Sequence, residues 1–256
     1  ALLCFPMGVP WRCTVTAIRP SPLHRYADAV PSMTDMDDER SDRVFRYLAY
    51  GSNLVVGGLA RYVGPVADHS PGEHVTVPGW HLRFQGHSTR WDGSPATIAP
   101  DGAARLVGRA WSLGRDSLIA VVAGEAGVAT HRAAFVVDAV IEGINEARAA
   151  SPPGRALGTG EGFVGGAVDR LTVSGTHWSA PVTRPISQYD TVVAIDHADG
   201  ALWAVTASVP DTLRRRCEPY LAQVHLGLTD LVGHEDATGE IEAALARSSR
   251  LPHTSA

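Results

Sequence analysis

The chain of 256 residues has few cysteines, no long apolar run and no excess of basic residues. Its three cysteines, Cys4, Cys13 and Cys217, are too few and too scattered for a disulfide framework, so a reduced, cytoplasmic setting is expected. No apolar stretch approaches the ~20 residues that a membrane helix requires. The apolar N-terminus lacks the basic leader and long apolar core of a signal peptide. We therefore expect no membrane partner.

The balance of charge and the spacing of the histidines exclude two further classes of function. Lys and Arg together number 22 against 27 Asp and Glu, a net charge of −5, whereas nucleic-acid binding usually needs clustered basic residues. The 11 histidines do not show the spacing of a helical metal-binding pair, and no Cys-x-x-Cys motif accompanies them. We therefore expect neither a nucleic-acid partner nor a metal site.

Composition changes along the chain and indicates one folded domain after an N-terminal tail. Residues 1–43 contain five prolines and then a short acidic stretch, which is typical of a disordered tail or linker. The remainder, residues 44–250, is ordinary for a globular domain, because the chain is 45% hydrophobic and 19% charged.

Short apolar runs bounded by Gly, Pro or Asp predict strands through the middle of the domain. They begin with the run 44–50, which ends at Gly51. The later predicted strands are 74–77, 80–84, 96–99, 106–113, 167–173, 191–195 and 201–209.

Helical spacing of apolar residues predicts the helices between and after these strands. From Ala134 the residues Val137, Val140, Ile141 and Ile144 form one stripe, which ends before Pro152. Weaker patterns predict helices at 54–62 and 115–123, and two C-terminal stripes predict helices around 221–231 and 241–246. Strands and helices do not alternate regularly, which indicates an α+β fold with a largely antiparallel or mixed, curled sheet.

The turn Tyr50-Gly51-Ser52-Asn53-Leu54 is the most informative local feature. Gly51 permits a tight turn after the first strand, and Ser52 and Asn53 favour turns and helix N-caps. Free backbone N–H groups in such a turn can receive a carboxylate or an oxyanion. From local chemistry alone, a plain strand-to-helix turn remains the alternative.

The stretch 47–54, Tyr-Leu-Ala-Tyr-Gly-Ser-Asn-Leu, resembles the signature of gamma-glutamylcyclotransferase-like proteins. The segments 78–84, 95–98 and 108–113 resemble later motifs of that family in the same order, so the resemblance covers residues 44–128. It implies a small curled or closed mixed β-sheet, a gamma-glutamylcyclotransferase-like barrel with flanking helices. Residues from about 130 to 165 then look like an insertion.

The resemblance also implies an activity and its residues. The family's reaction cyclises a γ-glutamyl amine or peptide to 5-oxoproline and releases the amine, a transferase- or lyase-type amide cleavage that needs no cofactor. Tyr50, Gly51, Ser52, Asn53 and Leu54 would bind the small-molecule γ-glutamyl substrate. A single carboxylate would move the proton.

Two glutamates compete for the role of that carboxylate. Glu125 follows a predicted helix, in the position that the resemblance implies, although Ala120 to Ala123 lack the Leu-Asp that commonly precedes the family's acid. Glu161 also lies in a Glu-Gly pair and precedes a predicted strand, but a glycine-rich loop surrounds it. We favour Glu125, because a general base needs rigid positioning. Its alternative reading is an ordinary solvated glutamate at a helix end.

Other patterns are weaker. Residues 160–165 match a Gly-x-Gly-x-x-Gly fingerprint, but no strand precedes it and no helix follows, so a dinucleotide cofactor is not expected. Ser52 lacks the Gly-x-Ser-x-Gly context of an acyl nucleophile. Tyr189 and Tyr220 could close over a substrate, although packed aromatics are the commoner case. Two other functions stay open: γ-glutamyl transfer or amide hydrolysis on a biosynthetic substrate, and small-molecule binding without catalysis.

Overall fold

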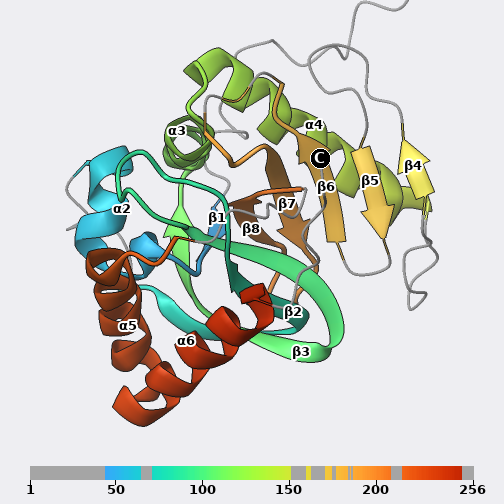
Figure 1. The fold of residues 1–256 in the computed structure, drawn as a ribbon. Helices are drawn as coiled ribbons and strands as arrows, with labels where there is room; N and C mark the ends of the chain where they lie inside the picture. The colour runs from blue at the N-terminus through green and yellow to red at the C-terminus, as the bar shows by residue number, and fades with distance from the viewer. Residues whose placement is uncertain are drawn as a thin grey trace, which may run out of the picture. The chain divides into compact units, whose positions relative to one another are not determined.

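The computed structural model of the chain describes residues 44–64, 71–150, 160–162, 171–174, 177–183, 185, 187–208 and 215–249. The predicted tail or linker at 1–43 lies outside these residues. The described strands form one mixed sheet in the order β2-β3-β1-β8-β7-β6-β5-β4 (Figure 1). Its strands are β1 Phe45–Ala49, β2 Glu73–Phe84, β3 Ala96–Leu113, β4 Gly160–Gly162, β5 Leu171–Ser174, β6 His177–Pro181, β7 Thr191–Ile195 and β8 Leu202–Thr206.

The central strands are buried on both faces, which explains why they are almost entirely apolar. In β1 the side chains of Phe45, Tyr47 and Ala49 belong to one hydrophobic cluster, whereas Leu48 and the following Tyr50 belong to the other. The same alternation divides β7 and β8 between the two clusters. Successive side chains of a strand point to opposite faces, so one short run supplies two cores.

Helices cover each face of the sheet. One cluster joins β1, β6, β7 and β8 to α3 (Arg115–Ala126) and α4 (Thr130–Ala150), and the other joins β2 and β3 to α5 (Glu218–Val232) and α6 (His234–Ser249). Figure 1 shows these two helix pairs on different sides of the sheet. Within the described residues no single helix is long and apolar enough to cross a membrane; α3 and α4 meet that criterion only together, across a bend of 115°.

The hairpin of β2 and β3 curls the sheet. Both strands are continuous where the sequence predicts two shorter ones each, because the pairing carries through a register shift between Pro78 and Trp80, with Gly79 at φ 78°. The far half of the hairpin folds over the sheet, so that Trp80 packs edge-on against His177 of β6, with ring centroids 5.0 Å apart. β1 and β8 are parallel and the other described pairs antiparallel, and no described pair joins β2 to β4. The sheet is therefore curled and mixed, and it is open between these edges.

Most predicted elements are present with shifted ends. The predicted helix at 54–62 is a 3-10 turn, η1 (Ser52–Leu54), followed by α2 (Val56–Val63). The helix predicted at 115–123 continues to Ala126, so that Glu125 lies in its last turn. The sequence pattern does not predict β6, whose five residues alternate between half-buried and buried positions. The predicted insertion at about 130–165 begins with α4, which packs into the core; whether that segment is an insertion stays a prediction.

Candidate active site

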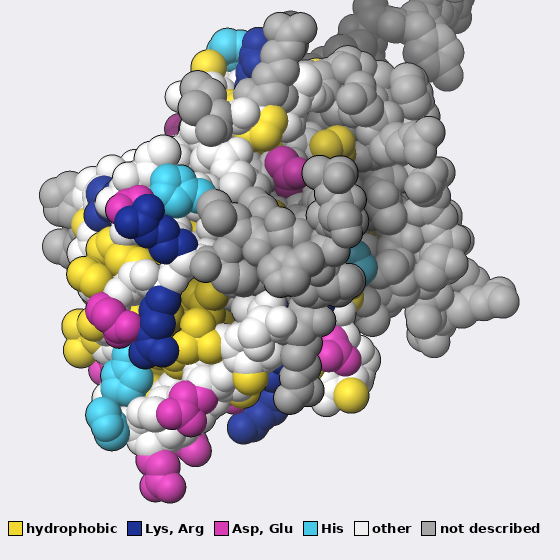
Figure 2. All heavy atoms as spheres, in the orientation of Figure 1, with side chains coloured by type: hydrophobic (Ala, Val, Ile, Leu, Met, Phe, Trp, Pro, Cys, Tyr) yellow, Lys and Arg dark blue, Asp and Glu magenta, His cyan; other side chains and the backbone are white. Residues whose placement is uncertain are grey.

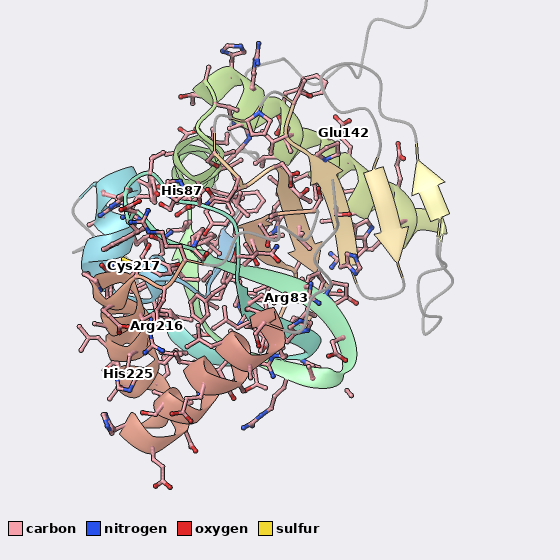
Figure 3. All side chains as sticks on the ribbon, in the orientation of Figure 1. Arg83, His87, Glu142, Arg216, Cys217 and His225 are labelled. Carbon is pink, nitrogen blue, oxygen red and sulfur yellow. The ribbon has the colours of Figure 1, made fainter. Side chains whose placement is uncertain are left out.

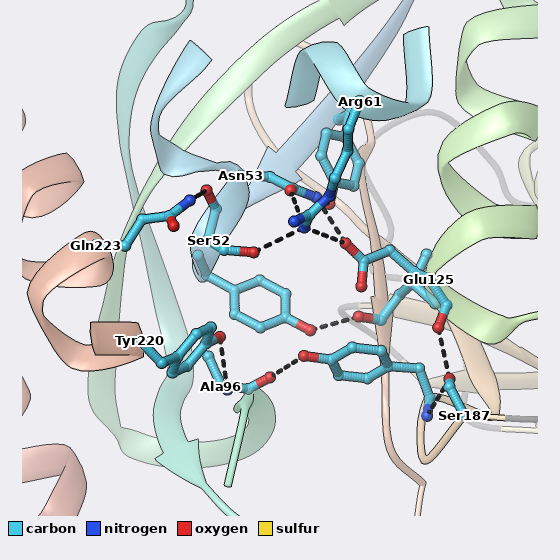
Figure 4. A network of polar contacts seen from close by, with 12 residues as sticks. Ser52, Asn53, Arg61, Ala96, Glu125, Ser187, Tyr220 and Gln223 are labelled. Carbon is cyan, nitrogen blue, oxygen red and sulfur yellow. Dashed lines mark hydrogen bonds and ion pairs between the residues drawn. The ribbon is translucent and has the colours of Figure 1, made fainter. Parts of the chain in front are cut away.

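The backbone of the turn that follows β1 is held by one internal hydrogen bond and by hydrogen bonds from two other elements. The Leu54 N–H donates to the Gly51 carbonyl over 3.0 Å and closes η1. The Ser52 carbonyl accepts a hydrogen bond from Gln223 of α5, and the Asn53 carbonyl accepts one from the Trp111 indole of β3. Gln223 and Trp111 come from distant parts of the chain and fix the position of the turn in the fold, and Figure 4 shows the contact between Ser52 and Gln223.

Two glycines allow the close packing around this turn. A Cβ atom on Gly51 would lie 2.8 Å from the Tyr220 hydroxyl, and one on Gly58 of α2 would lie 1.9 Å from the Ser52 carbonyl oxygen. Both distances are below van der Waals contact, so the side chains of α5 and the backbone of α2 approach the turn only because these positions lack a side chain.

The Glu125 carboxylate meets the turn at Asn53. The Asn53 Nδ2 atom donates to Glu125 Oε1 over 2.8 Å and to the Tyr47 hydroxyl over 2.9 Å. The Tyr62 hydroxyl is a second donor to Glu125, and a Cβ on Gly124 would lie 2.3 Å from the Tyr62 ring, so the bare helix surface at Gly124 receives that ring. These contacts place the carboxylate next to a residue 72 positions earlier in the chain.

Arg61 of α2 connects the turn to the carboxylate. Its Nη2 atom donates to Ser52 Oγ over 2.9 Å and to Asn53 Oδ1 over 3.1 Å, and lies 3.9 Å from Glu125 Oε1. The guanidinium also lies over the Tyr62 ring, 4.7 Å from its centroid. A single arginine therefore orients both polar side chains of the turn and supplies a positive charge beside the carboxylate.

Burial sets the protonation behaviour of Glu125. The side chain is 14% exposed, and its removal from water raises the pKa of the carboxyl above its ordinary value. The hydrogen bond from Asn53, the charge of Arg61 and the hydrogen bond from Tyr62 all lower that pKa and offset part of the effect. A glutamate with a raised pKa that is still held by fixed donors is suited to accept and return a proton.

Glu125, Ser52, Arg61 and Tyr62 line one cavity of about 260 Å³. The other lining residues are His87, Ser88, Thr89, Arg90, Trp91, Pro95, Gly124, Gly127, Ser187, Gln188, Tyr189 and Tyr220. The segment at Ser187 is tied to the end of α3, because its hydroxyl donates to the Glu125 carbonyl. A cavity of this size, with a buried carboxylate and a cation in its wall, fits a small polar ligand.

Tyr220 occupies a central position in the wall of this cavity. Its hydroxyl accepts a hydrogen bond from the Ala96 N–H over 2.9 Å and another from the Ser52 N–H. The neighbouring Tyr189 hydroxyl donates to the Ala96 carbonyl over 2.7 Å. The Ser52 N–H of the turn is thus already bound to a side chain, and Arg61 is the positive group of the cavity wall that lies beside Glu125.

The residues predicted from the Tyr-Gly-Ser-Asn-Leu turn occupy different positions. Ser52 lines the cavity, and Asn53 contacts the Glu125 carboxylate directly. Tyr50 is buried, with its hydroxyl donating to the Val205 carbonyl, and Leu54 is fully buried against Gly227 of α5. Gly51 lies behind the turn against Tyr220.

The alternative base, Glu161, has its backbone in β4, paired with Thr172 of β5. β4 is an edge strand, and four strands separate it from β1 in the sheet. The side chain of Glu161 lies outside the described residues, so the choice between the two glutamates stays a prediction.

Three contributors to the site carry no clear signal in the sequence. Arg61, Tyr62 and Gln223 lie on helices, where their spacing is that of ordinary surface or packed residues. The one available signal is the Gly-Gly pair of α2, because a glycine inside a helix often marks a close approach of backbone. Tyr189 and Tyr220 are visible in the sequence only as aromatic residues among others.

A second cavity, of about 690 Å³, lies between the start of β1, the turn before β8 and the C-terminal half of α4. Its polar wall includes Arg46, which donates to Glu73 over 3.0 Å and lies 3.7 Å from Asp199. Both of these carboxylates are exposed. Among the described residues, no group of three His, Cys, Asp or Glu side chains is arranged to hold a metal ion.

No family model matches the chain, and no curated protein matches it. Several solved structures are similar to it, among them the following three. An uncharacterized protein from Homo sapiens is 14% identical, with 78% of this chain and 88% of that one covered and a TM-score of 0.41. A protein described as gamma-glutamyl cyclotransferase is 13% identical, with 78% and 87% of the two chains covered and a TM-score of 0.40. YkqA from Bacillus subtilis is 14% identical, with 82% of this chain and 58% of that one covered and a TM-score of 0.39. At this identity and these TM-scores the similarities carry no inference about activity, which rests on the geometry of the chain itself.

Proposed function

We propose that the protein is a gamma-glutamylcyclotransferase-type enzyme that cyclises a γ-glutamyl amine or peptide to 5-oxoproline. The observation that carries the proposal is the buried Glu125 carboxylate, bound by Asn53 of the Tyr-Gly-Ser-Asn-Leu turn in a cavity that Arg61 also lines. The turn motif indicates the substrate class by resemblance, and the raised pKa of Glu125 indicates the chemistry.

The proposed reaction is intramolecular. The α-ammonium of the glutamyl group loses a proton to Glu125, and the resulting amine attacks the γ-carbonyl carbon to close the five-membered ring. The bond from that carbon to the leaving nitrogen then breaks. Two protons leave the attacking nitrogen and two reach the leaving nitrogen, so the products are 5-oxoproline and an ammonium, and no other reactant is consumed.

Each group in the wall has a role in this proposal. Arg61 would face the α-carboxylate of the substrate, because a guanidinium binds carboxylates through charge-assisted hydrogen bonds. Asn53 would hold Glu125 in position through the 2.8 Å hydrogen bond. The Ser52 and Tyr220 hydroxyls would face the developing oxyanion. The cavity would hold the folded conformer of the glutamyl chain, which provides most of the rate enhancement in an intramolecular reaction.

Product identity tests the proposal. The purified protein is incubated with γ-glutamyl amino acids, glutathione and γ-glutamylamines, and 5-oxoproline is measured by mass spectrometry. We expect 5-oxoproline in stoichiometric amounts with the released amine. Release of glutamate in its place would support amide hydrolysis, and the absence of turnover with every donor would contradict the enzymatic proposal. Glu73→Gln, in the other cavity, is the matched control for Glu125→Gln.

A further inference from the structure

The connection between β2 and β3 forms a rigid turn in the wall of the smaller cavity. Ser88 and Gly93 pair as an antiparallel bridge, and the Ser88 N–H donates to the Gly93 carbonyl over 2.8 Å. Between them Asp92 adopts a left-handed conformation, at φ 48°, which is uncommon for a residue other than glycine. The turn therefore has a defined conformation that presents its middle residues.

The segment before α5 fixes this turn from behind. The Cys217 thiol donates to the Trp91 carbonyl over 2.9 Å, and a Cβ on Gly93 would lie 2.4 Å from the Cys217 Cβ. The Ser94 N–H donates to the Arg215 carbonyl over 2.7 Å. The backbone of the turn is thus joined to the segment that leads into α5, which fixes the backbone positions from which the side chains of Arg90 and Trp91 project.

The one acidic side chain of the turn is already paired. Asp92 lies 2.6 Å from the Arg215 guanidinium and 3.1 Å from His87 Nε2. Arg90 has its guanidinium over the Trp91 ring, 5.0 Å from the centroid, and among the described residues no carboxylate lies within ion-pair distance of it. The positive charge of Arg90 is therefore oriented by an aromatic ring and not neutralised by the turn's own acid.

Arg90 is connected to the catalytic groups through two aromatic rings. Trp91 packs against Tyr220 with ring centroids 5.2 Å apart, and the Tyr220 hydroxyl binds the Ser52 N–H. Arg90, Trp91 and Tyr220 line the same cavity as Glu125. Basic side chains also gather on this face in the region where Figure 3 places His87, as the space-filling view shows (Figures 2 and 3).

We infer that residues 87–91, at this turn, form the subsite for the leaving group and that Arg90 selects leaving groups that carry a carboxylate. The inference rests on the proposed cyclisation, in which the glutamyl part occupies the end of the cavity at Arg61 and Glu125. The leaving amine then extends over Tyr220 and Trp91, and its carboxylate meets the Arg90 guanidinium. The preferred donors are γ-glutamyl amino acids or peptides, and simple γ-glutamylamines bind this subsite less well.

A matched pair of donors tests this subsite. γ-Glutamyl-alanine and γ-glutamyl-alaninamide differ only in the charge at the end of the leaving group, and kcat/KM is measured for both. For the wild-type protein we expect the acid to be the better donor. Arg90→Met keeps the aliphatic stem and removes the charge, so the acid-to-amide ratio of kcat/KM should fall by about 10- to 100-fold, as for loss of a hydrogen bond to a charged group.

Arg216→Met is the control, because Arg216 pairs with Glu218 and does not line the cavity. It should leave the acid-to-amide ratio unchanged, and circular dichroism of all variants excludes a folding effect. If Arg90→Met leaves the acid-to-amide ratio of kcat/KM unchanged, the assignment of the leaving-group subsite is wrong, and the proposed cyclisation is unaffected. No 5-oxoproline from either donor, or from any other, overturns the cyclisation and the subsite with it.

Discussion

Two cavities among the described residues combine arginine with carboxylates, but only the smaller of these two buries a carboxylate. In the cavity of about 690 Å³, Arg46 pairs with Glu73 and Asp199, whose side chains are 65% and 73% exposed. In the cavity of about 260 Å³, Glu125 is 14% exposed and receives hydrogen bonds from Asn53 and Tyr62. The larger cavity therefore has the more solvent-exposed carboxylates, and the smaller cavity has the buried one.

This contrast shows why the volume of a cavity is a poor guide to its chemistry. An exposed ion pair is solvated and screened, and it contributes little to stability or reactivity. A buried carboxylate loses its hydration, which raises its pKa. Hydrogen-bond donors and positive charges beside it lower that pKa again and offset part of the rise. In the smaller cavity, burial alters the affinity of Glu125 for a proton in the way that general base catalysis requires.

The largest expected effect is on catalysis. Glu125→Gln keeps the shape of the side chain but cannot accept a proton, so kcat for 5-oxoproline formation should fall by about 10²- to 10⁴-fold. Glu73→Gln in the larger cavity should change kcat by less than about two-fold, because exposed ion pairs contribute little. Steady-state kinetics with a γ-glutamyl amino acid measures both. Equal effects of the two substitutions would remove the distinction between the cavities.

The next largest effect is on stability, through the packing of α2 against the turn in the wall of the smaller cavity. Gly58→Ala places a Cβ 1.9 Å from the Ser52 carbonyl oxygen, so η1 must shift. The free energy of unfolding should fall by about 1–3 kcal/mol, as for other overpacked sites. Gly57→Ala, one residue earlier in α2, meets nothing within 4 Å and should raise that free energy by about 0.5–1 kcal/mol. Urea denaturation compares the two neighbours, and a stable Gly58→Ala protein would argue against the observed position of the turn.

Arg61→Met tests the positive charge beside Glu125. The guanidinium lowers the pKa of the Glu125 carboxyl, so its removal should raise that pKa further. Because the base must be deprotonated to act, activity is lost as the pH falls through the pKa, and the acid limb of the kcat/KM profile should move to higher pH. At neutral pH we expect a loss of about 10-fold in kcat/KM from the weakened substrate contact. Arg46→Met should leave the acid limb in place.

The smallest effect is a gain in stability. A carboxyl whose pKa is raised in the folded protein prefers its proton there, so it destabilises the fold once the pH is high enough to ionise it in the unfolded chain. Glu125→Gln should therefore raise the free energy of unfolding at pH 7 by about 0.5–2 kcal/mol, within the range of other stabilising substitutions. The gain should shrink as the pH falls through the raised pKa of Glu125 and should vanish below the ordinary pKa of glutamate. Urea denaturation at pH 7 and pH 4 measures the difference, and a loss of stability at pH 7 would contradict the raised pKa.

Local patterns predict much of the fold because local physics decides it. The run 44–50 alternates between two hydrophobic clusters and becomes β1, and the stripe at Val137 to Ile144 becomes the buried face of α4. The pattern fails where tertiary contacts override it. Pro78 and Gly79 look like a strand break, yet pairing with β3 absorbs them as an irregularity within one strand. β6 reads His-Trp-Ser-Ala-Pro and contains no β-branched residue, so pairing with β5 and β7, and not its own pattern, makes it a strand.

In the candidate site, too, some features follow from the local sequence and others only from tertiary contacts. The sequence is sufficient to identify a strand, a tight Gly-Ser-Asn turn and a glutamate at the end of a helix, because dihedral preference and periodicity act over a few residues. Only the tertiary structure brings Asn53 to Glu125, 72 residues apart, and Gln223 to Ser52, 171 residues apart. The raised pKa of Glu125 follows from burial by these distant segments. Desolvation depends on everything that surrounds a group in space, and no short stretch of sequence contains that information.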